Sequence, residues 1–348
     1  MSGFTPEVVA QLNDLRVDFD AKMAEIPTAQ AEAMELFSDI MQLLTVAIQA
    51  ELLEDAEEAA EDPAPSIEAA SEPQEYPLKG WDRYVLLDSG ARFQNWLLKD
   101  LDHVGLSAGL KLEKAAKNIL IENVTIQGAS KWGSRIHNAI GVCFKNCSIR
   151  DVNAEHGIYA NVGYSELASL FLLNVDIHNC GSQAVQTVWR ERESDDIERD
   201  RQGGGLIFLH KVSASRTGWN SEVGRPSYAF TFGDLEGADR PVQIEDCTLD
   251  NTMLEEGRGM LLIEPRSWAR VMGSTFRHTR STQTSVVLRG IRNLEVRGCH
   301  FEALNPSDYD RIRIDNCDRV TFQDCTGNLP VYVDGAFVGP VGEVSLTP

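Results

Sequence analysis

The central and C-terminal parts of the chain repeat one short pattern of apolar and polar positions. In "NLEVRGCHF" (293–301), apolar residues alternate with polar ones, then a turn-forming residue and a small residue follow. The same phrase recurs as "ILIENVTI", "VCFKNCSI" and "VQIEDCTL". Alternation with a period of two is typical of a β-strand with one buried face. The pattern therefore predicts short strands separated by turns, with Asn, Asp or Gly at each turn.

The small residue after the turn marks a series of repeats. Its positions are Val124, Cys147, Val175, Val212, Cys247, Ser274, Cys299 and Cys325. The intervals between them are 23, 28, 37, 35, 27, 25 and 26 residues. Repeats of this length, built from strands and turns, indicate a solenoid in which equivalent residues of successive coils form rows. We expect the cysteines to fill a buried corner as small, reduced and unreactive apolar residues.

This pattern resembles the pectate-lyase-like right-handed parallel β-helix. The resemblance implies an all-β, single-stranded solenoid over residues 110–328, preceded by an α-helical segment. The strands at either end of a solenoid need to be covered. We assign an N-terminal cap with a short amphipathic helix to residues 77–109. A C-terminal hairpin or tail is expected over residues 329–348, where Asp334-Gly335 is a hairpin signal.

Residues 1–58 show a helical period and are predicted to form an oligomerisation or docking segment. Thr5 and Pro6 begin one helix, and Pro27 and Thr28 separate it from a second. Heptad-like spacing gives the helices an apolar stripe of Val8, Leu12, Leu15, Phe19, Met34, Phe37, Met41, Leu44 and Ile48. Because a two-helix hairpin cannot leave such a stripe in water, we expect contacts with other copies, in a homotrimer, or with another protein. Packing on the body of the same chain is the alternative.

Charge separates the N-terminal part of the chain from the rest. Residues 1–76 hold 18 acidic and two basic side chains, whereas residues 77–348 hold 35 and 30. Residues 59–76, rich in Pro, Ala and Glu, have the composition of an acidic linker. The net charge of −21 argues against nucleic acid as a partner. No secretory signal and no apolar run of about 20 residues is visible, so we expect no membrane insertion.

The two longest intervals between repeats, 37 and 35 residues, place insertions near residues 189–205 and 215–240. Insertions on adjacent coils are expected to form the wall of a groove. Exposed aromatic rings stack on sugars, while acids and arginines bind hydroxyl groups. The predicted carbohydrate-binding residues are Trp189, Arg192, Asp195, Asp196, Trp219 and Tyr228. Alternatively, the charged run is a solvated loop and the aromatic residues cover the core.

A row of charged residues is a candidate for a catalytic site, although a weaker one than the predicted sugar-binding surface. Glu264, Arg289 and Asp315 follow inward residues at equivalent positions of three coils. Carboxylates two coils apart would lie about 9.6 Å from each other, at the upper edge of the range for inverting glycosidases. We favour a structural role, in which alternating charges relieve repulsion between stacked like charges. His156 and His178, at turns, are further candidates for a general base.

The order of segments resembles that of bacteriophage tailspikes and head or tail fibres. This resemblance implies a virion structural protein, assembled in the host cytoplasm. It would attach to other virion proteins through residues 1–60 and contact host-surface polysaccharide with its β-helix. The alternatives are a β-helical polysaccharide lyase or glycoside hydrolase, and a capsid decoration protein without a ligand. The motifs of β-helical polygalacturonases and pectate lyases are incomplete, so no catalytic residue is carried over, and no cofactor or metal is expected.

Overall fold

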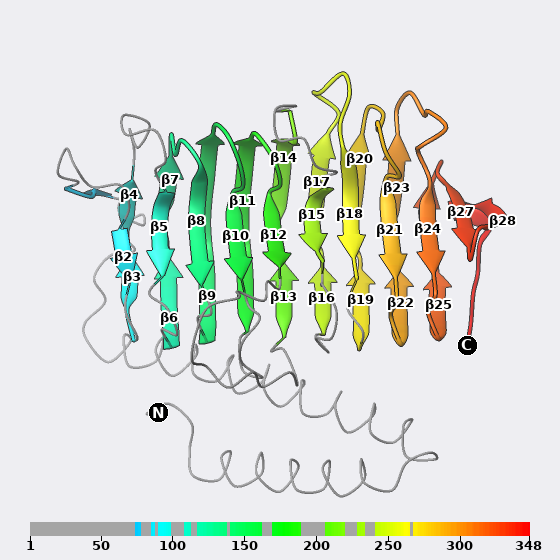
Figure 1. Ribbon diagram of the computed structural model, residues 1–348, viewed down its shortest axis with the longest axis horizontal. Coiled ribbons are helices and arrows are strands. Elements are labelled where there is room, and N and C mark those ends of the chain that lie inside the picture. The colour runs from blue at the N-terminus through cyan, green and yellow to red at the C-terminus, as the bar shows by residue number, and fades with distance from the viewer. Residues whose placement is uncertain are drawn as a thin grey trace, which may run out of the picture. The chain divides into compact units, whose positions relative to one another are not determined.

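The computed structural model describes residues 74–77, 85–87, 90–98, 108–112, 117–137, 140–161, 169–188, 206–219, 228–233, 241–264 and 267–348. They belong to the second of two compact units, Glu72–Pro348. This unit is a parallel β-solenoid (Figure 1), which confirms the all-β repeat architecture. The predicted helices of residues 1–58, with all the oligomerisation candidates, and the predicted acidic linker up to residue 73 lie outside the described residues.

One wall of the solenoid is an 11-stranded sheet, called here the short sheet. Its strands, in order, are β2 (Val85–Leu87), β5 (Ala108–Leu112), β8 (Trp132–His137), β10 (Ile158–Asn161), β12 (Val185–Val188), β15 (Tyr228–Phe232), β18 (Gly259–Ile263), β21 (Val286–Arg289), β24 (Ile312–Asp315), β27 (Pro330–Val333) and β28 (Ala336–Pro340). Neighbouring strands from β2 to β27 pair in parallel. The remaining strands among the described residues belong to the opposite wall.

The opposite wall is a 17-stranded sheet, called here the long sheet. Its strands are β1 (Gln74–Glu75), β3 (Arg92–Gln94), β4 (Trp96–Leu98), β6 (Lys117–Glu122), β7 (Thr125–Gln127), β9 (Ile140–Val152), β11 (Leu170–Cys180), β13 (Ile207–His210), β14 (Ser213–Thr217), β16 (Val242–Glu245), β17 (Thr248–Asn251), β19 (Trp268–Met272), β20 (Thr275–His278), β22 (Asn293–Arg297), β23 (His300–Ala303), β25 (Arg319–Gln323) and β26 (Thr326–Gly327). From β3 on, a coil contributes either two short strands or one long bent strand to this sheet.

The bend in the long sheet is made by one residue per coil with a positive φ. These residues are Asn95, Asn123, Asn146, Asn174, Lys211, Asp246, Gly273, Gly298 and Asp324, with φ between 51° and 60°. Asn, Asp and Gly adopt this left-handed conformation at the lowest cost. Asparagine side chains at the bend also bond between coils, since Asn123 Nδ2 donates to Asn95 Oδ1 at 2.7 Å. The turn-forming residue of the sequence repeat is therefore this bend.

The residue after each bend forms the predicted buried row. Val175 pairs with Cys147, and the residues that follow the small residue are in register from β7 to β26. All eight members of the row, from Val124 to Cys325, are at most 4% exposed. Burial raises the pKa of Cys247 to about 12, so this thiol stays protonated at neutral pH. The prediction of a stacked, buried cysteine corner is confirmed.

Apolar side chains from both sheets fill the space between them. Phe276 and Phe301, on successive coils, stack with ring centroids 5.2 Å apart, and Phe322 continues the stack at 6.5 Å. Full burial of one such side chain contributes roughly 1.5–3 kcal/mol. Because equivalent residues stack along the whole solenoid, each coil is stabilised mainly by its two neighbours.

Parallel pairing begins before residue 110. Strands β2, β3 and β4 pair with β5, β6 and β7, so the described residues of the stretch expected to form the cap are strands and turns of the solenoid. At the other end, Asp334-Gly335 is the turn of an antiparallel hairpin, β27–β28, which ends the short sheet. Leu346 pairs with Phe322 at the end of the long sheet. Among the described residues, no helix has the length and apolar character to cross a membrane.

Candidate functional site

The residues predicted to bind sugar do not form one described surface. Four of them, Trp189, Arg192, Asp195 and Asp196, lie outside the described residues. Trp219 follows β14 and is 42% exposed. Tyr228 begins β15 and is buried, with 8% of its surface exposed. Its ring lies so close to the next coil that a Cβ on Gly259 would overlap it, so Tyr228 packs on the solenoid.

The charged row lies on the outer face of the short sheet, as its spacing predicts. Arg289 and Asp315 are in register, and Glu264 follows Ile263 at the equivalent position of the preceding coil. Arg289 makes an ion pair with Glu264, and Arg313 contacts Asp315 at 2.5 Å between Nη2 and Oδ2. Each carboxylate is thus paired with an arginine. This arrangement supports the structural interpretation, a ladder of alternating charge.

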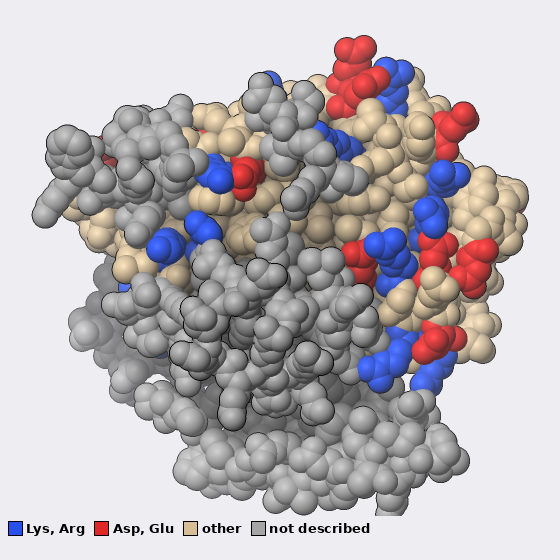
Figure 2. All heavy atoms as spheres, in the orientation of Figure 1, with Lys and Arg blue, Asp and Glu red and all other residues tan. Residues whose placement is uncertain are grey.

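Further ion pairs cross between coils on the outer face of the long sheet. Arg270 Nε lies 2.8 Å from Glu295, and Arg277 Nε lies 2.7 Å from Glu302. Figure 2 shows basic and acidic side chains interspersed, without a patch of one sign, on the described surface that it displays. The C-terminal coils therefore present neutralised charge.

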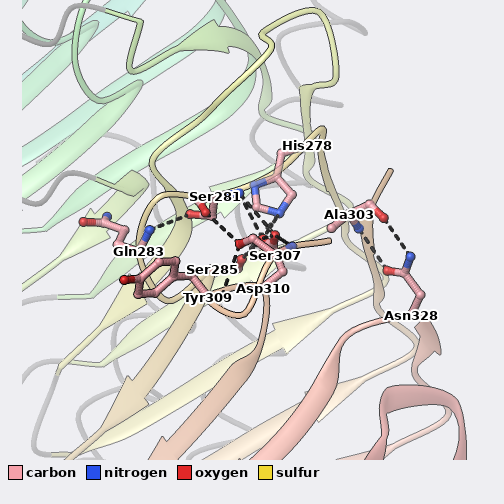
Figure 3. A network of polar contacts seen from close by, with 9 residues as sticks. All are labelled: His278, Ser281, Gln283, Ser285, Ala303, Ser307, Tyr309, Asp310 and Asn328. Atoms are coloured by element: carbon pink, nitrogen blue, oxygen red, sulfur yellow. Dashed lines mark hydrogen bonds and ion pairs between the residues drawn. The ribbon is translucent and has the colours of Figure 1, made fainter. Parts of the chain in front are cut away.

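A buried polar cluster joins the end of β20 and the loop that follows it to the corresponding loop of the next coil (Figure 3). Its centre is Asp310, which lies 2.8 Å from His278 Nε2 and accepts a hydrogen bond from Ser285 Oγ at 2.6 Å. The backbone amides of Ser281 and Ser307 also donate to this carboxylate, at 3.1 and 2.7 Å. Burial alone would raise the pKa of Asp310, but the hydrogen bonds from His278, Ser285 and Ser307 lower it to about 2.

Serine, histidine and aspartate meet in this cluster, but not as a nucleophilic triad. In a triad the serine donates to histidine, and the other imidazole nitrogen bonds to the carboxylate. Here Ser285 Oγ and His278 Nε2 both contact the same oxygen of Asp310. All three residues are at most 2% exposed, so no substrate reaches them. The cluster fastens loops together, and sequence reasoning missed it because its members lie in loops of unequal length.

Aromatic side chains of two successive coils form a different kind of surface on the short sheet. Trp132 begins β8, while Tyr159 lies on β10 and His156 just before it. The Tyr159 ring stacks on His156 with centroids 5.4 Å apart and planes 19° apart, and it lies 6.5 Å from Trp132. Trp132 and Tyr159 are half-buried. We call Trp132, His156 and Tyr159 the aromatic cluster.

Charged side chains surround the aromatic cluster. Lys131 Nζ and the Arg135 guanidinium carbon lie 4.3 and 4.5 Å from the centroid of the Trp132 ring. Lys131 also pairs with Glu155 at 3.2 Å. Arg135 is in register with Tyr159 on the next coil. Sequence reasoning singled out His156 alone, as a general base. Aligning "KWGSRI" with "EHGIYA" at an offset of 24 residues would have brought the other members together.

Comparisons with known proteins add no identification. Searches of protein-family models, curated proteins and solved structures gave no match to this chain. Within the part of the chain that the structure describes, no group of three or more His, Cys, Asp or Glu residues is placed to hold a metal ion. Because the fold alone does not define a function, the aromatic cluster and its charged neighbours are the features from which function is inferred.

Proposed function

We propose that the protein is a carbohydrate-binding β-solenoid that acts without cleaving its ligand. The aromatic cluster carries this proposal. Sugar-binding surfaces combine aromatic rings, which stack on apolar sugar faces, with charged groups that bind hydroxyls. Trp132 and Tyr159 supply half-buried rings on adjacent coils, the buried His156 supports the Tyr159 ring, and Lys131 and Glu155 supply donors and acceptors beside them. Trp132 and Tyr159 stand on strands of the short sheet, and Lys131, Glu155 and His156 lie in the turns just before these strands.

The ion-paired carboxylates favour binding over catalysis. A general acid in a glycosidase needs a carboxyl group that can protonate a leaving group near neutral pH. Glu264 and Asp315 are each engaged in an ion pair with an arginine instead of lying free beside a ligand site. If new reducing ends or unsaturated uronates appeared on incubation with polysaccharides, and Glu264→Gln or Asp315→Asn abolished them, the enzyme alternative would replace this proposal.

The proposal also covers the assembly in which the protein acts. The order of segments supports a role as a virion appendage. The test is whether the protein is retained on virus particles and whether deletion of residues 1–60 abolishes this retention. Light scattering of the full chain and of this deletion variant tests the proposed homotrimer. We also propose the right-handed winding of pectate-lyase-like β-helices, because parallel crossovers within one sheet are almost always right-handed.

Glycan binding itself is tested with single-ring variants. We expect the full chain to bind a subset of a bacterial-glycan array, and Tyr159→Ala to weaken that binding about three- to tenfold, the contribution of one stacked ring. Tyr309→Ala is the matched control, because Tyr309 is 52% exposed and lies on a loop outside the aromatic cluster. Absence of glycan binding, or an equal loss in both variants, would refute the proposed function.

A further inference from the structure

We infer that the aromatic cluster recognises an anionic sugar residue, carrying a carboxylate or a sulfate, and that Arg135 is the residue that binds the anionic group. This inference rests on the proposed function and names its ligand class. It begins with an arginine that lacks the acidic partner seen at six arginines of the C-terminal coils. Arg135 makes no ion pair with any described residue, and its contact is the face of Trp132 at 4.5 Å.

Six arginines of the C-terminal coils are neutralised by acidic side chains. The ion-paired arginines there are Arg270, Arg277, Arg280, Arg289, Arg297 and Arg313. Each has an acidic partner on its own coil or a neighbouring one. Arg135 stands on the same kind of outer face, in register with Tyr159 and Lys111, but faces no carboxylate across the coil. Within the described residues its charge is therefore not balanced by an ion pair.

Two buried donors next to each other strengthen the inference. Arg135 Nε and Trp132 Nε1 are both inaccessible to solvent and donate to no acceptor. A buried donor without an acceptor destabilises the fold, and its presence in a native protein needs an explanation. Both donors belong to β8 and lie at the same indole ring. An oxygen-rich anion that shifts these side chains slightly on binding would provide the acceptor that both need.

The local balance of charge also favours an anion. Lys131 and Arg135 bring two positive charges to the Trp132 ring, and Glu155 brings one negative charge. The cluster is therefore net positive on a chain with a net charge of −21. Guanidinium binds planar anions such as carboxylates through paired, charge-assisted hydrogen bonds. A uronate ring that stacks on Tyr159 could place its carboxylate at Arg135, because the two residues are neighbours across the strands.

The experiment compares glycans that differ only in charge. Binding of the full chain is measured by calorimetry with hyaluronan and its methyl ester, and with dextran sulfate and dextran. The variants are Arg135→Gln, which removes the charge, and Arg135→Lys, which keeps the charge but loses the paired hydrogen-bond donors of the guanidinium group. Arg150→Gln is the control, because Arg150 is an exposed arginine of β9 in the long sheet that bonds only to Ser148 nearby. Thermal unfolding establishes that each variant is folded.

We expect the wild-type protein to prefer the charged member of at least one pair. Arg135→Gln should reduce that preference roughly tenfold to a hundredfold, the range for hydrogen bonds to charged groups. Arg135→Lys should retain part of it, and Arg150→Gln should leave it unchanged. If esterified or neutral glycans bind as tightly as charged ones, or Arg135→Gln keeps the preference, the anionic inference is wrong while the proposed function stands. If no glycan binds and Tyr159→Ala changes nothing, the proposed function itself is wrong.

Discussion

Asp310 and His278 lie 2.8 Å apart in the interior of the solenoid, although His278 ends β20 and Asp310 lies in a loop of the next coil. Their side chains are almost completely buried, and Ser285, in the loop that follows β20, bonds to the same carboxylate. A buried charged group is tolerated only where partners replace the water that it has lost. These contacts therefore fix the path of the long loops at one corner of the C-terminal coils.

Removal of the Asp310 carboxylate should destabilise the fold strongly. Asp310→Ala leaves His278, Ser285 and two backbone amides without their acceptor, for which we expect a loss of about 3–5 kcal/mol in the free energy of unfolding. Urea denaturation monitored by circular dichroism measures this loss. Asp308→Ala, at an exposed position on the same loop, should change the stability by less than about 0.5 kcal/mol. Equal effects of the two substitutions would contradict the role given to Asp310.

The same carboxylate predicts a dependence of stability on pH. The pKa of Asp310 falls from 3.8 to about 2 in the folded protein. Its ionised form therefore stabilises the fold above about pH 4, and this contribution of roughly 2 kcal/mol is lost as the pH falls towards 2. Asp310→Asn cannot titrate at this position. The difference in unfolding free energy between wild type and Asp310→Asn should shrink by that amount between pH 5 and pH 2; a constant difference would show that the ionised carboxylate is not stabilising.

The left-handed bends predict an unusual tolerance for glycine. Asp324 has a φ of 54° and is exposed, so its replacement probes mainly the backbone. Asp324→Gly should keep the stability or change it only slightly, whereas Asp324→Val should cost about 1–2 kcal/mol, because a branched Cβ clashes in this conformation. Thermal and urea unfolding of both variants test the difference. A less stable glycine variant would mean that the side chain, not the backbone, is important at this bend.

The buried corner predicts which replacements of cysteine are accepted. Valine occupies the same place in other coils, as Val175 and Val212 show, so Cys247→Val should alter the unfolding free energy by less than about 1.5 kcal/mol. Cys247→Leu adds volume where the neighbouring coils lie close, and overpacking typically costs about 1–3 kcal/mol. Parallel urea titrations of the two variants compare these costs. If leucine were accepted as well as valine, the corner would be less tightly packed than its burial indicates.

The corner and the bends could be predicted from sequence because they depend on local rules. An Asn, Asp or Gly followed by a small residue, between alternating apolar positions, defines both features in the coils from Val124 to Cys325, except before Val212, where the bend residue is Lys211. The first coil could not be predicted in this way, because Trp96 occupies the place of the small residue after the bend at Asn95. There the solenoid begins, and Trp96 packs on Tyr76 with ring centroids 5.1 Å apart. A bulky residue fits at this end because it is only half-buried.

The aromatic cluster and the buried polar cluster were harder to predict because they depend on which coils are neighbours. Trp132 and Tyr159 are separated by 27 residues, and their contact follows from the strand register of β8 and β10. His278 and Asp310 meet through loops that share no repeat pattern. The charged row could be predicted because each of its members comes directly after an inward-facing residue of the repeat. Spacing placed Arg289 beside Asp315 correctly, and only the structure shows the additional partner, Arg313.

Coil length and rod geometry are independent in this molecule. The stretch from Val175 to Val212 is 37 residues long and that from Cys299 to Cys325 is 26, yet the strands that follow these residues keep an unbroken parallel register in both cases. Extra residues enter between strands, where they leave the spacing of the stacked walls unchanged. The scaffold can therefore acquire new surface by growth of its connections, and foreign peptides inserted at the same junctions should be displayed without loss of the rod.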